Sequence, residues 1–314
     1  MVSKRLRQRV YNKRKQLDKL RPIPPNILKN IRERYNSIFV YNSNAIEGNT
    51  LTESETILVL ERGITIGGKS LKEHLEAINH KKAIEYIHEI ASKKIPISEE
   101  MILNLHSILM KDVLPDEQVG KYRTRSVIIQ GAVIQPPVAQ EVPHEMENLI
   151  FIINNNPEKI DPFEFCAQIH AKFEQIHPFS DGNGRIGRLL LNLMLIHQNF
   201  IPLTIKKIDR MTYLDVLSKA DQGNYGLIIN FLLRCEEQAL DFYLEAFTPN
   251  FTPFNYKSLS ELAKNTQYSP AYLNLLIRQG KIPGKKIGKK WFTTMEAIQN
   301  YIKSVRKNED KERS

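Results

Sequence analysis

Apolar residues recur at helical spacing over most of the first 250 positions of the chain. The segments with such an apolar face are residues 71–87, 101–110, 165–176, 211–220 and 225–247. Residues 186–198 are apolar on almost every side, which predicts a helix near the centre of the core. The pattern therefore predicts a mostly helical protein.

Capping signals place the ends of several of these helices. Thr52 and Ser70 each stand three positions before a glutamate, which is the spacing of a capping box. Ser98 precedes residues 101–110, and Asp161 followed by proline predicts the next helix start. Gly63 is the expected end of the helix that begins after Thr52.

Strand signals are confined to two short stretches. In residues 125–137, RSVIIQGAVIQPP, two β-branched runs flank residues 130–132, and two prolines close the segment, which predicts a hairpin. Residues 281–292, KIPGKKIGKKWF, alternate like a tight hairpin about Gly288. We therefore expect an all-α fold with a small β-hairpin and a separate small module near residue 288.

The chain has 314 residues, of which 41% are hydrophobic and 25% charged, an ordinary globular composition. Its two cysteines form no metal-binding spacing, which favours buried thiols in a reducing compartment. No apolar run is long enough to span a membrane, and the basic N-terminus lacks the apolar core of a signal peptide. We expect a cytoplasmic protein.

Charge is unevenly distributed along the chain. Residues 1–21 hold nine Lys and Arg against one Asp, and residues 251–314 hold thirteen against five acidic residues, although the net charge is only +10. The middle is therefore acidic, which predicts separate tasks for the two basic ends. We expect the N-terminal arm to be a solvated or disordered helix rather than a nucleic-acid contact.

The stretch HPFSDGNGRIGR, residues 177–188, interrupts two helical segments with chemically active side chains. The amides at the start of the second helix, opened by Gly182 and Gly184, make an anion site. Asp181 is a suitable Mg²⁺ ligand, and Arg185 and Arg188 share one helical face where they can grip phosphates. His177 is placed to take a proton from an alcohol. The DGNG segment alone is more often a tight turn, and an arginine pair alone is more often a solvated helix face. Together with the histidine, these residues predict phosphoryl or nucleotidyl transfer.

The segment HPFSDGNGR resembles the Fic family signature HPFx(D/E)GN(G/K)R, with Arg188 as its second arginine. The resemblance implies a helical core with a β-hairpin, and transfer of AMP from Mg-ATP to a Tyr, Thr or Ser hydroxyl of a target protein or of the enzyme itself. It implies His177 as general base and Asp181 as the Mg²⁺ ligand. It also implies a buried Phe179, the α-phosphate on Asn183 and loop amides, and the outer phosphates on Arg185 and Arg188. The death-on-curing branch carries Lys where this chain has Gly184.

The predicted hairpin at residues 125–137 resembles the family's flap, which aligns a target segment by strand addition, with Ile128 and Ile129 as contacts. By itself this is a weak signal, because any helical protein can carry a hairpin. Two further histidines, His106 and His170, lie on apolar helical faces and are expected in the core.

Residues 43–48, SNAIEG, match the inhibitory motif (S/T)xxxE(G/N) of Fic proteins whose brake precedes the core. The resemblance predicts that Ser43, Glu47 and Gly48 form this motif. Glu47 would then pair bidentately with Arg188 and oppose the γ-phosphate, so that ATP binds in an unreactive pose. The alternatives are a surface ion pair of little weight, and a role for Glu47 in removing AMP from a target.

The pattern after residue 257 predicts a helix, a turn, a second helix, a basic hairpin and a final helix, which resembles excisionase and MerR-like winged helix-turn-helix modules. Were it to bind DNA, the contacts would come from the second helix and the hairpin. The expected DNA-binding residues are Tyr272, Asn274, Arg278, Lys285, Lys286, Lys289 and Lys290. The alternative is a module that docks a protein partner.

These predictions divide the chain into an N-terminal helical region with the inhibitory motif (1–95), a Fic catalytic domain (96–250) and a winged helix-turn-helix domain (251–314). The expected function is an auto-inhibited protein adenylyltransferase that uses ATP and Mg²⁺, with a homodimer as a possible assembly. The alternatives are a DNA-binding regulator with the Fic core as nucleotide sensor, transfer of another phosphate-linked group, and removal of AMP.

Overall fold

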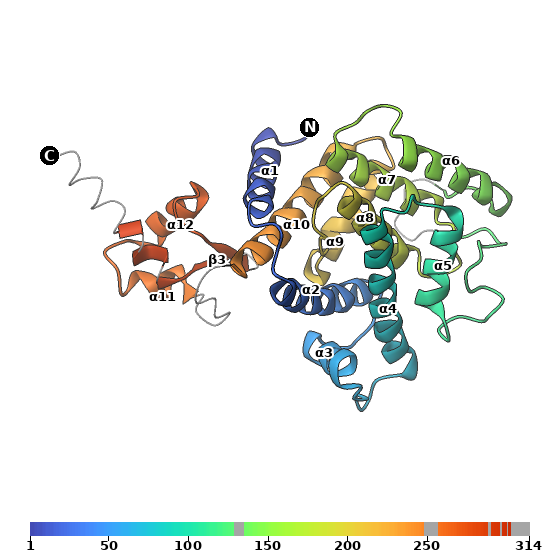
Figure 1. Cartoon of the computed structure of the whole chain (residues 1–314), viewed down its shortest axis with the longest axis horizontal. Helices are drawn as coiled ribbons and strands as arrows, with labels where there is room; N and C mark the ends of the chain where they lie inside the picture. Colours follow the sequence, from blue (N-terminus) through green and yellow to red (C-terminus); the bar gives the residue numbers. More distant parts are fainter. Residues whose placement is uncertain (129–134, 248–256, 288–289, 296, 300, 303–314) are drawn as a thin grey trace. The chain divides into compact units, whose positions relative to one another are not determined.

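The computed structural model describes residues 1–128, 135–247, 257–287, 290–295, 297–299 and 301–302, which form two compact units, Met1–Ala246 and Phe247–Ser314 (Figure 1). Within these residues, no helix combines the length and the apolar character needed to cross a lipid bilayer.

The described part of the first unit is helical, as the apolar periodicity predicts. Its elements are α1 (Lys4–Asp18), α2 (Pro25–Ile46), α3 (Glu53–Arg62), α4 (Leu71–Lys93), α5 (Glu99–Met110), η1 (Ala139–Glu141), α6 (Val142–Asn155), α7 (Pro162–Ile176), α8 (Asn183–His197), η2 (Lys207–Asp209), α9 (Arg210–Ala220) and α10 (Tyr225–Glu245).

Helix α8 is the central element of this unit. It contacts α2, α4, α5 and α7 (Figure 1). Every residue from Arg185 to Leu195 is buried. This confirms the expected core position of the apolar segment 186–198. Because the N-terminus of α8 carries the second half of the motif 177–188, the core fixes the place of that motif.

The predicted caps are present. Thr52 and Ser70 form complete capping boxes with Glu55 and Glu73, and Gly63 ends α3 at a left-handed φ of 64°. At α5 and α7, side-chain oxygens of the cap residues accept hydrogen bonds from the first-turn amides. Local sequence therefore sets the ends of the helices around the motif.

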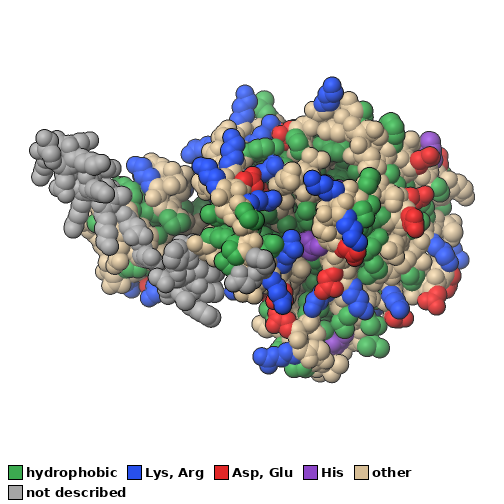
Figure 2. All heavy atoms as spheres, in the orientation of Figure 1, with side chains coloured by type: hydrophobic (Ala, Val, Ile, Leu, Met, Phe, Trp, Pro, Cys, Tyr) green, Lys and Arg blue, Asp and Glu red, His purple; other side chains and the backbone are tan. Residues whose placement is uncertain are grey.

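The expectation that the basic N-terminal arm is solvated or disordered is wrong. The arm forms α1, which packs on α10 and buries Leu6, Val10 and Leu17. Figure 2 shows basic side chains gathered over this helix. Some of them pair with acidic residues of α10, as in the two hydrogen bonds of 2.8 and 2.9 Å from Arg9 to Glu237. The net charge of the arm does not reveal these ion pairs, because the acidic partners on α10 lie more than 200 residues away in the sequence.

The expected hairpin at residues 125–137 falls largely outside the described residues, which omit 129–134 and with them Ile129. Of the described flanks, residues 126–128 and 135–138 form no strand, and Ile128 is 95% exposed. The hairpin and its two isoleucines therefore stay predictions.

The second unit contains β1 (Lys257–Ser258), α11 (Leu259–Ala263), α12 (Pro270–Arg278), β2 (Lys285–Ile287) and β3 (Lys290–Thr293). The antiparallel strands lie in the order β1-β3-β2, with Ile287 opposite Lys290. The pairing of β2 with β3 confirms the predicted hairpin, whereas the short strand β1 was not predicted. The apolar residues that pack together beneath these elements are Leu259, Leu262, Leu273, Leu276, Ile277, Ile282 and Ile298.

Candidate active site

The loop between α7 and α8 brings a histidine and a helix N-terminus to one place. His177 ends α7 with a left-handed φ of 50°, and Gly182 precedes α8 with a φ of 84°. Left-handed backbone is uncommon for a residue other than glycine, so the surroundings must hold His177 in this conformation. These two left-handed residues turn the chain at the start and the end of the loop. The loop therefore leads into the first turn of α8, whose backbone amides lack intrahelical partners.

Asn183 organises this loop from inside. Its side-chain amide is buried, donates to the Phe179 carbonyl and accepts from the Phe179 amide, both over 2.8 Å. The side-chain oxygen and one N–H of the Asn183 amide are engaged within the loop, and the expected contact of Asn183 with an α-phosphate stays a prediction. Phe179 itself is fully buried, as the family resemblance implies.

Under the loop, the fully buried His106 stacks on Phe179 with ring centroids 3.9 Å apart. Its Nε2 atom lies 3.2 Å from the Asp181 carbonyl, and its Nδ1 accepts from the Gly120 amide. Burial lowers the pKa of His106 to about 4, so it is neutral and supports the loop. His170 is equally buried, between the Gly187 carbonyl and the Tyr213 hydroxyl. Both are core histidines, as the sequence predicts.

His177 is half-buried, with Nδ1 3.4 Å from the Glu174 carbonyl. This contact favours a proton on Nδ1, which leaves the lone pair of Nε2 available to accept a proton. Burial lowers the pKa of His177, and the nearby Arg123 cation adds to the effect, while the carboxylates of Glu47 and Asp181 oppose it. The imidazole is therefore neutral near pH 7, as a general base requires.

Arg123, which was not predicted from the sequence, holds the turn at His177. Its Nε donates to the His177 carbonyl over 2.8 Å, and its backbone amide donates to the Pro178 carbonyl over 2.9 Å. The side chain is buried, and burial lowers its pKa. No motif marks this arginine, because its partners are backbone carbonyls brought together only by the fold.

Asp181 is the only carboxylate of the loop 177–182, and its side chain is 46% exposed. Its Oδ1 accepts from the Gly182 amide over 2.6 Å and lies 3.4 Å from Nη2 of Arg185. Among the described residues, both contacts use Oδ1, which leaves Oδ2 for a cation. In the described part of the chain, no group of three or more His, Cys, Asp or Glu is arranged so that it could hold a metal ion. A metal here would therefore need oxygens from a phosphate ligand, as Mg²⁺ commonly does.

Arg185 lies between two carboxylates. Its Nη1 is 3.2 Å from Oε1 of Glu76 on α4, its Nη2 faces Asp181, and its side chain is only 3% exposed. The second oxygen of Glu76 accepts from Asn49 over 2.8 Å. Glu76 and Asn49 are thus site residues that sequence analysis missed, because a single glutamate on a helix gives no pattern.

Arg188 is buried and bound to the segment 43–48. Its Nε donates to the Ser43 hydroxyl over 2.9 Å, and its Nη2 donates to the Ser43 carbonyl over 2.8 Å and to Oε1 of Glu47 over 2.7 Å. The structure therefore brings Ser43 and Glu47 to the arginine, as the inhibitory motif predicts. The recorded pair with Glu47 uses one carboxylate oxygen, whereas a bidentate pair was expected.

Two glycines allow this approach. Gly48 follows the end of α2 with a left-handed φ of 99°, so the chain turns away directly after Glu47. A Cβ atom on Gly184 would collide with Oε1 of Glu47 and lie 3.0 Å from Nη1 of Arg188. The carboxylate of Glu47 therefore lies over the first turn of α8, where the amides favour an anion.

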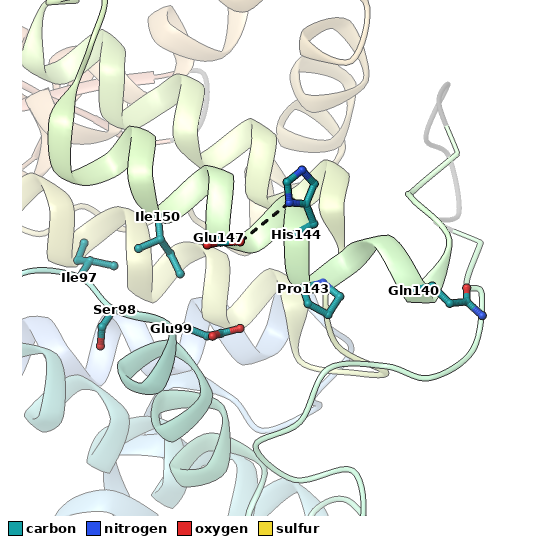
Figure 3. Close-up of a pocket in the computed structure, with 8 residues that line it drawn as sticks. All are labelled: Ile97, Ser98, Glu99, Gln140, Pro143, His144, Glu147 and Ile150. Carbon is teal, nitrogen blue, oxygen red and sulfur yellow. Dashed lines mark ion pairs between the residues drawn. The ribbon is translucent and has the colours of Figure 1, made fainter.

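A separate open cavity of about 670 Å³ lies where the start of α5 meets α6 (Figure 3). Its lining includes Glu99, His144 and Glu147, with His144 and Glu147 4.0 Å apart. None of the residues 177–188 lines it, so this cavity is distinct from the candidate active site.

In the second unit, the residues predicted to bind DNA do not share one face. Asn274 and Arg278 are one helical turn apart on α12, but Tyr272 lies roughly 160° around the helix from Asn274 and packs against Tyr268, with ring centroids 5.0 Å apart. Asn274 is half-buried, and its Oδ1 has no hydrogen-bond partner among the described residues.

Arg278 and Lys290 are exposed. Lys285 and Lys286 lie on β2, where only their backbone is described, and Lys289 lies outside the described residues. Arg278 and Lys290 are therefore the basic candidates whose exposure the structure describes.

Comparison with known proteins places the chain among Fic proteins. Residues 96–195 match the family model "Fic/DOC family". The chain is 34% identical over 273 residues to the protein adenylyltransferase Fic of Nematostella vectensis, an alignment that covers 82% of this chain and 62% of that relative. The chain thus spans less than two thirds of the length of this curated relative.

Solved structures agree with this assignment. A Fic domain containing signaling protein from Bacteroides thetaiotaomicron superposes with a TM-score of 0.69 at 32% identity, covering 77% of this chain and 96% of that one. Fic-1 of C. elegans superposes with a TM-score of 0.69 at 30% identity, covering 77% and 71%. With these relatives, and with the histidine, carboxylate and two arginines gathered around one loop, the chain belongs to the Fic/DOC family.

Proposed function

We propose that the chain is a protein adenylyltransferase, which transfers AMP from ATP to a Tyr, Thr or Ser hydroxyl of a protein. The observation that carries this proposal is the convergence of His177, Asp181, Arg185 and Arg188 at the start of α8. The name of the curated relative from Nematostella vectensis supports the same activity.

In this reaction His177 accepts the proton of the target hydroxyl at Nε2, and the hydroxyl oxygen attacks the α-phosphorus. The bond from the α-phosphorus to the bridging oxygen breaks, and pyrophosphate leaves. Arg185 and Arg188 hold the outer phosphates, and the amides of Gly182, Asn183 and Gly184 face the α-phosphate. Because His177 is neutral at pH 7, it can accept the proton without prior ionisation.

Asp181 would hold a Mg²⁺ ion, which would neutralise phosphate charge as pyrophosphate forms. The exposure of the Asp181 side chain and its available Oδ2 fit a metal whose other ligands come from ATP and water.

The motif formed by Ser43, Glu47 and Gly48 would act as a brake. With Glu47 on Arg188, the place of the γ-phosphate is occupied by a carboxylate that repels it. ATP would then bind with its α-phosphate poorly aligned for attack. Removal of AMP, with Glu47 positioning a water molecule, is the second candidate activity, because Glu47 lies over the turn where the α-phosphate would sit.

We also propose a role for each part of the chain. Residues 1–95 form the inhibitory region, 96–250 the catalytic domain with a flap that uses Ile128 and Ile129, and 251–314 a winged helix-turn-helix that binds DNA. The two helices and the β2–β3 hairpin of the second unit support the last assignment. A homodimer is the proposed assembly.

The test is mass spectrometry of the Glu47→Gly variant incubated with Mg-ATP and cell lysate. Adenylylation predicts a gain of one AMP on hydroxyl side chains, on the enzyme or a target, and its loss in Glu47→Gly/His177→Ala. A different added mass would identify another phosphate-linked donor, and no modification would contradict transferase activity. Unfolding curves of both variants would show that the changes leave the fold intact.

A further inference from the structure

Arg123 makes five hydrogen bonds, all to backbone carbonyls. Three go to consecutive residues at the end of α7: from Nη2 to Ile176 over 3.4 Å, from Nε to His177 over 2.8 Å, and from the backbone amide to Pro178 over 2.9 Å. The other two go from Nη1 to Arg125 over 3.1 Å and from Nη2 to Pro137 over 2.5 Å.

The first set of contacts explains how His177 is held. The last carbonyls of a helix lack partners and carry partial negative charge, so a cation is stabilising there. A left-handed φ at a residue other than glycine costs roughly 1–2 kcal/mol and persists only where the surroundings impose it. The fork of a planar guanidinium reaches several carbonyls at once, which a lysine ammonium does not.

The second set of contacts joins this turn to another part of the chain. Arg125 and Pro137 bracket residues 126–136, the segment expected to dock a target. One buried side chain therefore spans both ends of that segment and the backbone of the proposed base. Among the described residues, no carboxylate forms an ion pair with Arg123, so its cation serves only these carbonyls.

We propose that Arg123 is a positioning residue that fixes the His177 imidazole relative to the backbone at Arg125 and Pro137, and so to a target hydroxyl presented beside these residues. It touches neither nucleotide nor target. This proposal rests on the proposed transfer reaction. Substitution of Arg123 should therefore lower the rate of transfer but not the affinity for ATP, because Arg185 and Arg188 are held by other residues.

The positive charge of Arg123 also affects the pKa of His177. The charged groups around this imidazole are Arg123, which lowers its pKa, and Glu47 and Asp181, which raise it. Loss of the Arg123 cation moves the pKa of His177 upward, so the acidic limb of the rate profile should shift to higher pH. A residue that only stabilised the fold would leave that limb in place.

The experiment compares Arg123→Met and Arg123→Lys with Lys121→Met, a change of an exposed cation on the same loop, all in the Glu47→Gly background. We expect kcat for AMP transfer to fall about 10- to 100-fold in both Arg123 variants, with ATP affinity within about twofold. We expect the acidic limb to shift upward only in Arg123→Met, because lysine keeps the charge. Lys121→Met should behave as the parent.

Unchanged kcat in folded Arg123→Lys, or an equal loss of ATP affinity and kcat, would overturn the proposal. Thermal unfolding identifies variants that do not fold, and Arg123→Lys keeps the test available if Arg123→Met is one of them. Absence of transfer in the Glu47→Gly parent would instead contradict the proposed function, so the two failures are distinguishable.

Discussion

Nη2 of Arg188 lies 2.7 Å from Oε1 of Glu47, and the two residues are 141 positions apart in the chain. The arginine is buried and is also bound twice to Ser43, so the end of α2 and the first turns of α8 form one hydrogen-bonded unit. If Arg188 holds the γ-phosphate as proposed, the Glu47 carboxylate must first leave the guanidinium. The occupied Arg188 is therefore the feature through which the segment 43–48 would control the site.

Loss of the Glu47 carboxylate should release the brake. We expect AMP transfer by Glu47→Gly to rise at least about tenfold, since tenfold corresponds to only 1.4 kcal/mol and the pair has one fully buried partner. Glu47→Gln should give a smaller rise, because the amide keeps the volume but not the charge. The measurement is the initial rate of self-modification with labelled ATP.

Glu158→Gly, which removes an exposed glutamate from the turn between α6 and α7, is the matched control and should leave this rate unchanged. No gain, or a decrease in rate, for Glu47→Gly would contradict the brake.

Gly184→Ala should have opposite effects in two backgrounds. Its new Cβ collides with Oε1 of Glu47, the flexible end of a side chain, so the carboxylate should move off Arg188 at small cost. We therefore expect a several-fold rise in transfer when Glu47 is present. In Glu47→Gly the methyl group can only crowd the phosphate position, so the rate should fall. Similar changes in both backgrounds would show that Glu47 does not lie over Gly184.

Asn183→Ala should destabilise the protein even without nucleotide. The change leaves two buried backbone groups of Phe179 without partners, at a cost of about 1–3 kcal/mol. We expect a lower midpoint of chemical unfolding and a loss of transfer at saturating ATP. Ser180→Ala, on the exposed side of the same loop, should change stability by less than about 0.5 kcal/mol. An unchanged midpoint for Asn183→Ala would contradict the role of its side chain in holding the loop.

The second unit should bind DNA through charge. With random-sequence duplex, fluorescence anisotropy of the full chain should show an affinity that falls steeply with salt. Arg278→Ala and Lys290→Ala, which remove exposed cations, should each weaken binding and reduce the log–log salt slope by about one. Lys159→Ala, in the first unit, is the control. Salt-independent binding, or none at low salt, would favour the alternative of a protein-docking module.

Local signals in the sequence were sufficient for the main motif and for most of the helices, whereas α2 and α6 were not predicted. Thr52, Ser70 and Asp161 cap their helices through residues within four positions, so these caps can be predicted from a short stretch of sequence. The loop 177–182 is equally local, and its first and last residues take the backbone conformations that turn the chain.

Contacts between distant segments were predicted only where a family motif pointed to them. The pair of Glu47 with Arg188 is such a case, whereas Arg123 and Glu76 carry no motif. The packing of α1 on α10 was missed for the same reason. Its apolar positions, Leu6, Val10 and Leu17, are at helical spacing, but their charged neighbours suggested solvent. Periodicity outweighs net charge in such a segment, since apolar burial stabilises more than exposed charges do.

Two adjacent glutamates on α10 should respond to pH in opposite ways. Glu236 is fully buried, its Oε1 is 3.4 Å from the Ile201 amide, and burial raises its pKa to about 8. Burial also acts on Glu237, but hydrogen bonds and charges of Arg9 and Lys13 outweigh it and lower the pKa of that carboxyl. For Glu236 the folded chain binds more protons than the unfolded chain between about pH 4.3 and 8, so its contribution to stability declines as pH rises through this window.

Glu236→Gln should therefore flatten the decline of the unfolding free energy above about pH 5 and raise that free energy at pH 8 by roughly 1–3 kcal/mol. Glu237→Gln removes a carboxylate with two cationic partners and should lower the unfolding free energy at neutral pH, with the difference disappearing in acid as the wild-type carboxylate protonates. Denaturant titrations at several pH values measure both. Parallel pH profiles for wild type and Glu236→Gln would show that Glu236 ionises normally, and that water reaches the buried face of α10.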